Sequence, residues 1–492
     1  MNLTHLEEPL LEFGAGKHVD IRFGIMNYGP LDVDNAVAPK NINVGIVGTT
    51  ETIDGVRRWL EHCKNEISAK SNKEDPTKPN KQPNLFARFP GFNRGTGFYS
   101  NLILQDSLCR PLPKNDLPSI MNRAGRNERI SRAVDLFMEE IRYLAQNTSA
   151  PVIICAIPLS LLEGIGPEQN NEELDEEGEN DDAALQLDFH DMLKARAMQQ
   201  YRKPIQLILP STYDSDPTKQ RAQRRLKLGR ELQDEATRAW NIHTALYYKA
   251  GGVPWRLTRT STELTVCYVG VSFYRSLDKQ ALLTSVAQVF NERGEGVVVR
   301  GGTATISKDD RQAHLPERHA YELLKNALAS YWETHKTNPA RIVIHKSSRF
   351  DNEETQGFAE ALRERGIAMY DLLWVSNTTT RLYRVGPYPP LRGTLLTLDD
   401  LETVLYTRGS VPFFETYPGK YVPRPLRIHA ASTDQSQQYL AREILALTKM
   451  NWNNTQFDGS TPVTLRASRQ CSSVLRYCSE ARPIEPRYSF YM

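Results

Sequence analysis

The stretch LQLDFHDMLKARAMQQYRKPIQLILP (185–210) combines a helical pattern with a short apolar strand that follows it directly. If residues 187–201 form a helix, His190 and Lys194 lie one turn apart on the same side. Another apolar run, PVIICAIP (151–158), comes earlier in the chain and is typical of a strand buried on both faces of a parallel sheet. Strand, helix and strand at this spacing predict a βαβ unit.

The preceding segment, INVGIVGTTETIDGVRRWLEHC (42–63), predicts another strand, a tight turn and a helix capped by Thr49 or Thr50. Gly45 and Gly48 match part of a dinucleotide-binding fingerprint, but its third glycine is missing. Close packing of a strand against a helix is therefore the simpler interpretation. Residues 130–146 predict an amphipathic helix before the 151–158 strand.

The pattern changes after Pro254. Residues 263–274 and 284–302 predict antiparallel strands, 317–335 a helix and 340–345 a further strand. Antiparallel strands, a helix and then a parallel strand are the order of an RNase H-like domain. The predicted fold class is therefore α/β, with a Rossmann-like domain followed by an RNase H-like domain. A boundary near 255–262 gives the divisions 1–258 and 259–492.

Composition indicates a globular chain of 492 residues with 40% hydrophobic residues, 24% charged residues and a net charge of +2. An acidic run (168–182) and a basic run (219–230) stand out, and the acidic run is best interpreted as a solvated loop. We expect no secretory signal and no membrane-spanning segment. The six scattered cysteines form no CxxC pair, which favours a reducing cytoplasm over a zinc site or a disulfide framework.

Four polar side chains are candidates for one anion site. His190 and Lys194 share a helix face, Gln206 follows on the next strand, and Lys249 lies in the last turn of a later helix. Cations and an amide that converge suit a terminal phosphate, whose oxygens accept several charge-assisted hydrogen bonds. The alternative is a solvated helix face and a lysine that the helix dipole favours.

Two motifs carry a resemblance to prokaryotic Argonautes. ALYYKAGGVPWRL (245–257) resembles the end of their MID domain, and FHDMLKA (189–195) resembles the MID motif in which a lysine follows a histidine or aromatic residue by four. The resemblance implies that His190, Lys194, Gln206 and Lys249 hold the 5′-phosphate of a guide strand. Ala245 departs from the family, which often has a second lysine there.

The chain closes with RYSFYM (487–492). Argonautes bury an aromatic C-terminus beside the MID pocket, so the resemblance places the Met492 carboxylate near the guide phosphate or its Mg²⁺. It implies no metal ligand from side chains. The alternative is an ordinary ordered end.

A slicing Argonaute needs acidic side chains on its PIWI sheet to hold two metal ions. Ser272 and Lys346 stand where the resemblance places two of these acids, and 462–478 contains no Asp, Glu or His. We therefore expect no catalytic residues. An active RNase H-like nuclease with atypical metal ligands is the alternative, although a lone loop acid such as Glu295 or Asp309 could not hold two metals.

Three basic residues in the second half of the chain are consistent with nucleic-acid binding. Lys346, Arg349 and Arg466 are candidates for contact with guide or target phosphates, and the alternative for each is a solvated surface position.

The segments 6–31, 88–92 and 447–455 are similar to short prokaryotic Argonautes, which consist of MID and PIWI alone. The resemblance implies a short 5′-phosphorylated guide RNA and a single-stranded DNA target. It also implies a heterodimer with an effector that contains an APAZ region and a TIR, SIR2 or nuclease domain. Target pairing would then cause NAD⁺ depletion or nucleic-acid degradation, in defence against plasmids and phage. A Rossmann-like metabolic enzyme and a structural scaffold are the competing interpretations.

Overall fold

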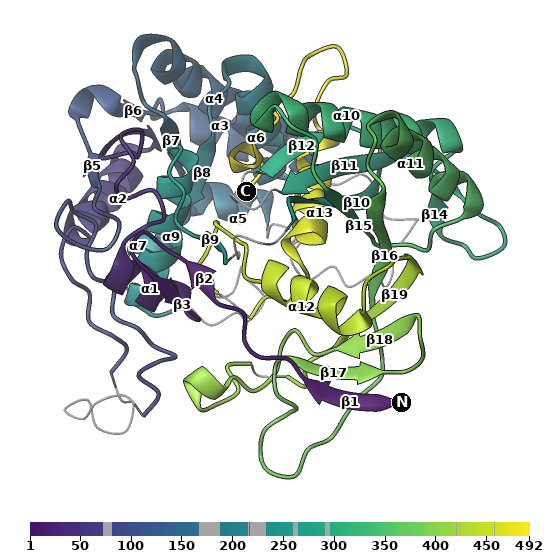
Figure 1. The fold of residues 1–492 in the computed structure, drawn as a ribbon. Coiled ribbons are helices and arrows are strands. Elements are labelled where there is room, and N and C mark those ends of the chain that lie inside the picture. Colours follow the sequence, from purple (N-terminus) through teal and green to yellow (C-terminus); the bar gives the residue numbers. More distant parts are fainter. Residues whose placement is uncertain are drawn as a thin grey trace.

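The structure is a computed structural model that describes residues 1–71, 81–166, 187–214, 216, 233–258, 264–290, 296–419, 421–456 and 458–492. The two main sheets with their helices lie one on each side of the chain's C-terminus (Figure 1). The acidic run 168–182, the basic run 219–230 and Glu295 lie outside the described residues, as do residues 259–263 at the predicted domain boundary. The division at residue 258 stays a prediction.

A parallel sheet forms the first half of the fold. Its strands are β4 (Asn41–Gly48), β5 (Asn101–Ile103), β6 (Cys109–Pro111), β7 (Val152–Ala156) and β8 (Ile205–Ile208). The order is β5-β4-β7-β8, β6 also pairs with β4, and every pairing is parallel. All five residues of β7 are buried, as the apolar run predicts.

Helices cover both faces of this sheet. Val152 and Ile154 of β7 pack in a core that includes α2 (Thr50–His62) and α9 (Glu235–Lys249). The intervening Ile153 and Cys155 pack in a second core, with α4 (Arg126–Asn147) and α6 (Phe189–Tyr201). Successive strand residues therefore enter opposite cores, as the period of two requires. This arrangement confirms the Rossmann-like prediction.

A larger sheet forms the second half. Within the described residues it has nine strands in the order β1-β17-β18-β19-β16-β15-β10-β11-β12. β10 (Val266–Arg275), β11 (Leu282–Phe290) and β12 (Gly296–Val299) are antiparallel neighbours. After α10 (Glu317–His335), β15 (Arg341–Lys346) pairs with β10 in parallel. This order confirms the RNase H-like prediction, and the small hairpin of β13 (Thr305–Ile306) and β14 (Ala313–His314) is an addition to it.

The remaining strands of the large sheet come from residues 369–432 and from the N-terminal segment. The other strands are β16 (Met369–Asn377), β17 (Thr394–Thr397), β18 (Glu402–Leu405), β19 (Leu426–Ser432) and the N-terminal β1 (Asn2–His5). β1 pairs with β17, almost four hundred residues away. Glu8 anchors the same segment because its carboxylate forms ion pairs with Arg392 and Lys449 at 2.9 Å each. Sequence patterns gave no sign of this pairing.

The remaining elements connect and cover the two sheets. β2 (Leu11–Glu12), β3 (Lys17–His18) and β9 (Arg256–Leu257) form a small sheet. The other helices are α1 (Ile21–Tyr28), α3 (Asp116–Met121), α5 (Leu159–Ile165), α7 (Pro210–Tyr213), α11 (Asn352–Glu364), α12 (Gln437–Leu447), α13 (Val463–Leu475) and the 3₁₀ turns 106–108, 412–414 and 488–490. None of the described helices has the length and apolarity to cross a membrane.

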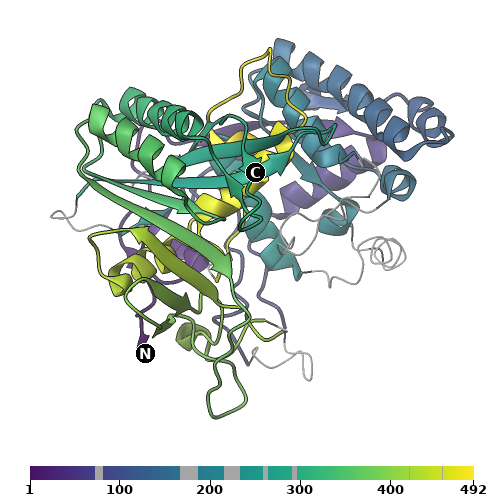
Figure 2. The same cartoon turned by 90° about the vertical axis from the view of Figure 1, so that its right-hand side faces the viewer.

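α13 and the chain end connect the two halves. α13 packs on β10 and β11 of the large sheet and also contacts α6 of the parallel sheet. Figure 2 shows the same C-terminus at the centre of the molecule after a 90° turn. Tyr488, Phe490, Tyr491 and Met492 are all buried. The chain end therefore lies in the interior beside α6.

Candidate functional site: a buried cationic socket and a buried lysine on the large sheet

The first side of the site is α6. Asp188 caps this helix by accepting a hydrogen bond from the Asp191 amide at 2.9 Å. The Phe189 ring packs edge-on against Phe137 of α4, which fixes the helix on the sheet. Lys194, at 2% exposure, then points inward and donates from Nζ to the Tyr491 carbonyl at 3.2 Å.

The opposite side is formed by β8 and the end of α9. Lys249 occupies the last turn of α9, and Gly251 follows with a φ of +96°, which ends the helix. Its Nζ donates to the Ile205 carbonyl at 2.9 Å and to Gln206 Oε1 at 2.7 Å. Lys249 is 5% exposed and forms no ion pair among the described residues. The ammonium therefore has neutral oxygens as its hydrogen-bond partners.

The two lysines lie close enough to repel each other. Burial lowers the pKa of Lys249 well below its ordinary value, and the charge of Lys194 lowers it further. A buried ammonium whose hydrogen-bond partners are neutral is costly, and an anion at hydrogen-bonding distance would offset that cost. We call Lys194, Gln206, Lys249 and the chain end at Met492 the socket.

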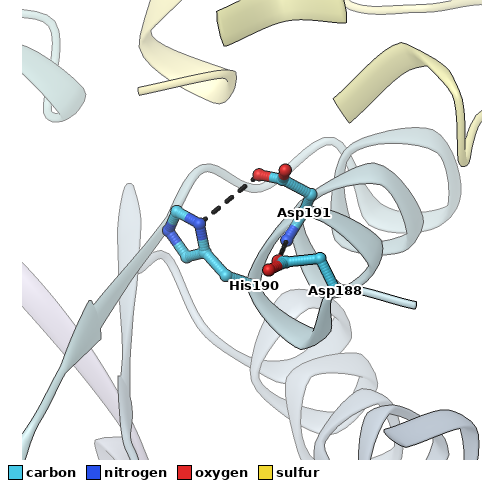
Figure 3. Close-up of side chains that lie close together, drawn as sticks. All are labelled: Asp188, His190 and Asp191. Atoms are coloured by element: carbon cyan, nitrogen blue, oxygen red, sulfur yellow. Dashed lines mark hydrogen bonds and ion pairs between the residues drawn. The ribbon is translucent and has the colours of Figure 1, made fainter. Parts of the chain in front are cut away.

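His190 lies at the rim of the socket, with a side chain that is 32% exposed. Its Nδ1 lies 3.4 Å from Asp191 Oδ1 (Figure 3). Burial and the neighbouring Lys194 lower the pKa of His190, although Asp191 acts in the opposite direction. Burial alone would raise the pKa of Asp191, but His190 and Lys194 together bring it below the ordinary value. The structure therefore brings all the predicted pocket residues to one region.

Two acids at this rim were missed by the sequence reasoning. Asp188, His190 and Asp191 each offer a ligand atom, and these atoms lie within 4.8 Å of one another. Carboxylate oxygens are the ligands that Mg²⁺ prefers, so this group fits the ion that the resemblance implies. The motif Asp-x-His-Asp at the start of a helix was the available signal. The expectation of no side-chain metal ligand stays a prediction.

Ser272 and Lys346, where the resemblance implies acids in a slicing Argonaute, lie within β10 and at the end of β15. Val271 pairs with Lys346, so Ser272 lies beside Lys346 in the sheet. Ser272 is buried, with its Oγ 3.5 Å from the Ser472 hydroxyl on α13. Lys346 is fully buried, and its Nζ lies 2.5 Å from Glu354. Lys346 is therefore neither a solvated surface residue nor open to a nucleic-acid phosphate in this structure, because it is buried and its ammonium binds Glu354.

Glu354 binds several partners at once. Its carboxylate accepts from Lys346, from the Leu315 amide at 2.8 Å and interacts with His314 Nδ1 at 3.2 Å. His314, Asp351 and Glu354 could hold a metal ion by their spacing. In the structure the atoms that would bind a metal already form these hydrogen bonds, and Asp351 and Glu354 also form the capping box of α11. Burial lowers the pKa of Lys346, and Glu354 acts in the opposite direction.

The predicted backbone-binding residues lie near this centre. Arg349 is exposed directly after β15, and its guanidinium lies 5.0 Å from the Trp374 ring centroid. Arg466 lies half-buried in the first turn of α13. Asp309 is exposed in the β13–β14 hairpin. Contact of either arginine with nucleic acid stays a prediction.

Comparisons with known proteins agree with the fold. No protein-family model and no curated protein matches the sequence. The structure is similar to that of Clostridium butyricum Argonaute bound to a guide DNA with a 5′ deoxycytidine and a 19-mer target DNA, with a TM-score of 0.63 at 14% sequence identity. The match covers 100% of this chain and 55% of that chain, so this chain spans about half the length of that Argonaute. The fold is therefore Argonaute-like and similar to a MID-PIWI architecture.

Proposed function

We propose that this protein binds the 5′-phosphorylated end of a short guide RNA in the socket and uses the guide to recognise single-stranded DNA. The observation that carries the proposal is the pair of buried lysines, Lys194 and Lys249, beside the buried chain end. A terminal phosphate supplies the anion that Lys249 lacks among the described residues. Gln206 then turns from a partner of Lys249 into an additional donor through its amide.

Base pairing supplies sequence recognition in this proposal. The protein holds one strand end and the backbone, and a basic channel accepts helical geometry without base-specific side chains. Arg349 and Arg466 lie on the PIWI side where they could contact the backbone. Guide affinity should therefore fall with salt, except for the part contributed by the desolvated socket.

We propose further that the chain does not cleave its target. The ammonium of Lys346 is bound to Glu354, and Ser272 cannot act as a carboxylate. The alternative function is an RNase H-like nuclease with atypical ligands, and the His314, Asp351 and Glu354 group is the observation that favours it. Guide-loaded protein incubated with complementary DNA and Mn²⁺ separates the two, because cleavage opposite the guide centre would establish the nuclease.

An effector partner completes the proposal. The resemblance to short Argonautes implies a protein with an APAZ region and a TIR, SIR2 or nuclease domain. This chain spans 55% of the length of the Argonaute that it matches. Target pairing would activate the effector, provided that the guide–target duplex binds two states of the complex unequally. The outcome would be NAD⁺ depletion or nucleic-acid degradation in defence against plasmids and phage.

The direct test is to purify the protein and sequence the nucleic acid that accompanies it. We expect short RNAs of narrow length with a 5′-phosphate. The variant Lys194→Glu should lose them, whereas Lys308→Glu, which changes an exposed lysine on the β13–β14 hairpin, should keep them. Equal recovery from both variants would refute the assignment of the socket.

A further inference from the structure

A second cavity lies at the carboxyl edge of the parallel sheet. Its volume is about 780 Å³, within the range of small-molecule sites. The loops that follow four strands line it, at residues 49–52, 112–114, 158–160 and 210–214. None of the socket residues lines it. The cavity is therefore a separate feature of the same sheet.

Its place matches the usual binding position in sheets of this kind. The chain leaves β4 for α2 on one face and leaves β7 for α5 on the other, so the winding reverses between these strands. Ligands of open parallel sheets bind outside the carboxyl ends of the strands at such a reversal. In Figure 1, α2 and α7 lie side by side at this edge of the sheet.

The cavity combines a helix N-terminus with cationic side chains. Thr49 caps α2 by accepting from the Thr52 amide at 3.2 Å. The Leu112 amide donates to the Gly48 carbonyl at 2.8 Å, which holds the loop bearing Lys114 beside the start of α2. Lys114 and Arg58 are exposed at the cavity and bring positive charge to it, although the carboxylates of Glu51, Asp214 and Glu235 line it as well. Phosphate groups bind well at such a helix start.

An aromatic wall faces these polar groups. The Tyr213 ring packs so closely on α2 that a Cβ added at Gly55 would lie 2.4 Å from it. Trp59 lines the same cavity and is 5% exposed. Its indole N–H has no acceptor among the residues that the structure describes.

We propose that this cavity is a second binding site, for a nucleoside phosphate. The aromatic and apolar wall at Trp59 and Tyr213 takes the base, while Lys114, Arg58 and the start of α2 take the phosphate. The Glu51 and Asp214 carboxylates accept from ribose hydroxyls or exocyclic amines. The ligand could be a free nucleotide or one nucleotide of a bound strand, because both carry a base and a phosphate.

The free-nucleotide source is tested by calorimetric titration of the full chain with AMP, CMP, GMP, UMP and inorganic phosphate. We expect at least one nucleotide to bind more tightly than inorganic phosphate. Lys114→Glu should weaken that binding by about tenfold, since it removes one charge-assisted contact. Ser160→Tyr, which places a ring at the cavity mouth, should also weaken it, and Lys308→Glu should leave it unchanged.

The strand source is tested with guide-loaded protein and a target DNA that carries photoreactive bases. Crosslinks that map to residues 49–62 or 210–214, and that Lys114→Glu reduces, support this source. Only the strand arm rests on the proposed function, because the free-nucleotide arm needs no guide. Loss of free-nucleotide binding in Lys249→Met would place the nucleotide in the socket and overturn the proposal. The absence of both nucleotide binding and crosslinks would overturn it as well.

Discussion

The substitution Lys249→Met separates two effects of the socket. One is its effect on the stability of the empty protein, and the other is its contribution to guide affinity. The Lys249 ammonium is buried, its hydrogen-bond partners are the neutral oxygens of Ile205 and Gln206, and Lys194 repels it. Methionine has a similar length and carries no charge. We therefore expect the free energy of unfolding of the empty protein to stay the same or rise, because a buried charge without a counterion is removed.

Guide binding should respond in the opposite direction. Loss of one charge-assisted hydrogen bond to the 5′-phosphate should cost about 1.5–3 kcal/mol, which corresponds to roughly 10- to 150-fold weaker binding. Filter binding with 5′-phosphorylated and 5′-hydroxyl guides measures the difference, and urea unfolding measures stability. The hydroxyl guide and the Lys308→Met variant are the controls. Equal weakening of both guides would refute the reasoning, and so would a large loss of stability without any loss of phosphate discrimination.

The pH dependence of the empty protein follows from the same lysine. Because the pKa of Lys249 is lower in the folded than in the unfolded protein, the unfolded protein binds more protons between the two values. Stability contributed by this group therefore rises with pH up to the ordinary lysine pKa. Lys249→Met should remove that rise.

Three further predictions concern other parts of the molecule. Glu354→Gln leaves the buried Lys346 ammonium without its counterion, so the free energy of unfolding should fall by about 3–5 kcal/mol in urea titrations, and a fall below about 1 kcal/mol would contradict the role of this ion pair. Asp191→Asn should abolish the Mg²⁺ dependence of 5′-phosphorylated guide affinity, measured against EDTA, and an unchanged dependence would place the ion elsewhere. Burial lowers the pKa of His345 from 6.5 to about 3, so stability should decline as the pH falls below 6.5, by about 1.4 kcal/mol per pH unit. His345→Gln should flatten this decline in acid titrations, and an unchanged slope would exclude His345 as a contributor.

The sequence predicted the fold and most of the socket because local signals were strong there. Apolar runs gave the strands of the parallel sheet, and the spacing of His190 and Lys194 gave their shared helix face. Gln206 and Lys249 were placed by the strand and the glycine stop that follow. These features depend on neighbours a few residues away, which patterns can reveal.

Other features depend on contacts between distant segments. β1 pairs with β17, and Glu8 binds Arg392 and Lys449, although each partner lies several hundred residues away. The ion pair of Lys346 with Glu354 requires the start of α11 to fold back onto the end of β15. Composition and periodicity carry no information on such pairings.

The most direct test of the central claim is a structure of the protein with a 5′-phosphorylated guide RNA. The account predicts the terminal phosphate within hydrogen-bonding distance of Lys194 Nζ, Lys249 Nζ and the Gln206 amide, beside the buried chain end. A strand terminus that binds elsewhere, with Lys249 still bound to Ile205 and Gln206 as in the empty protein, would contradict it.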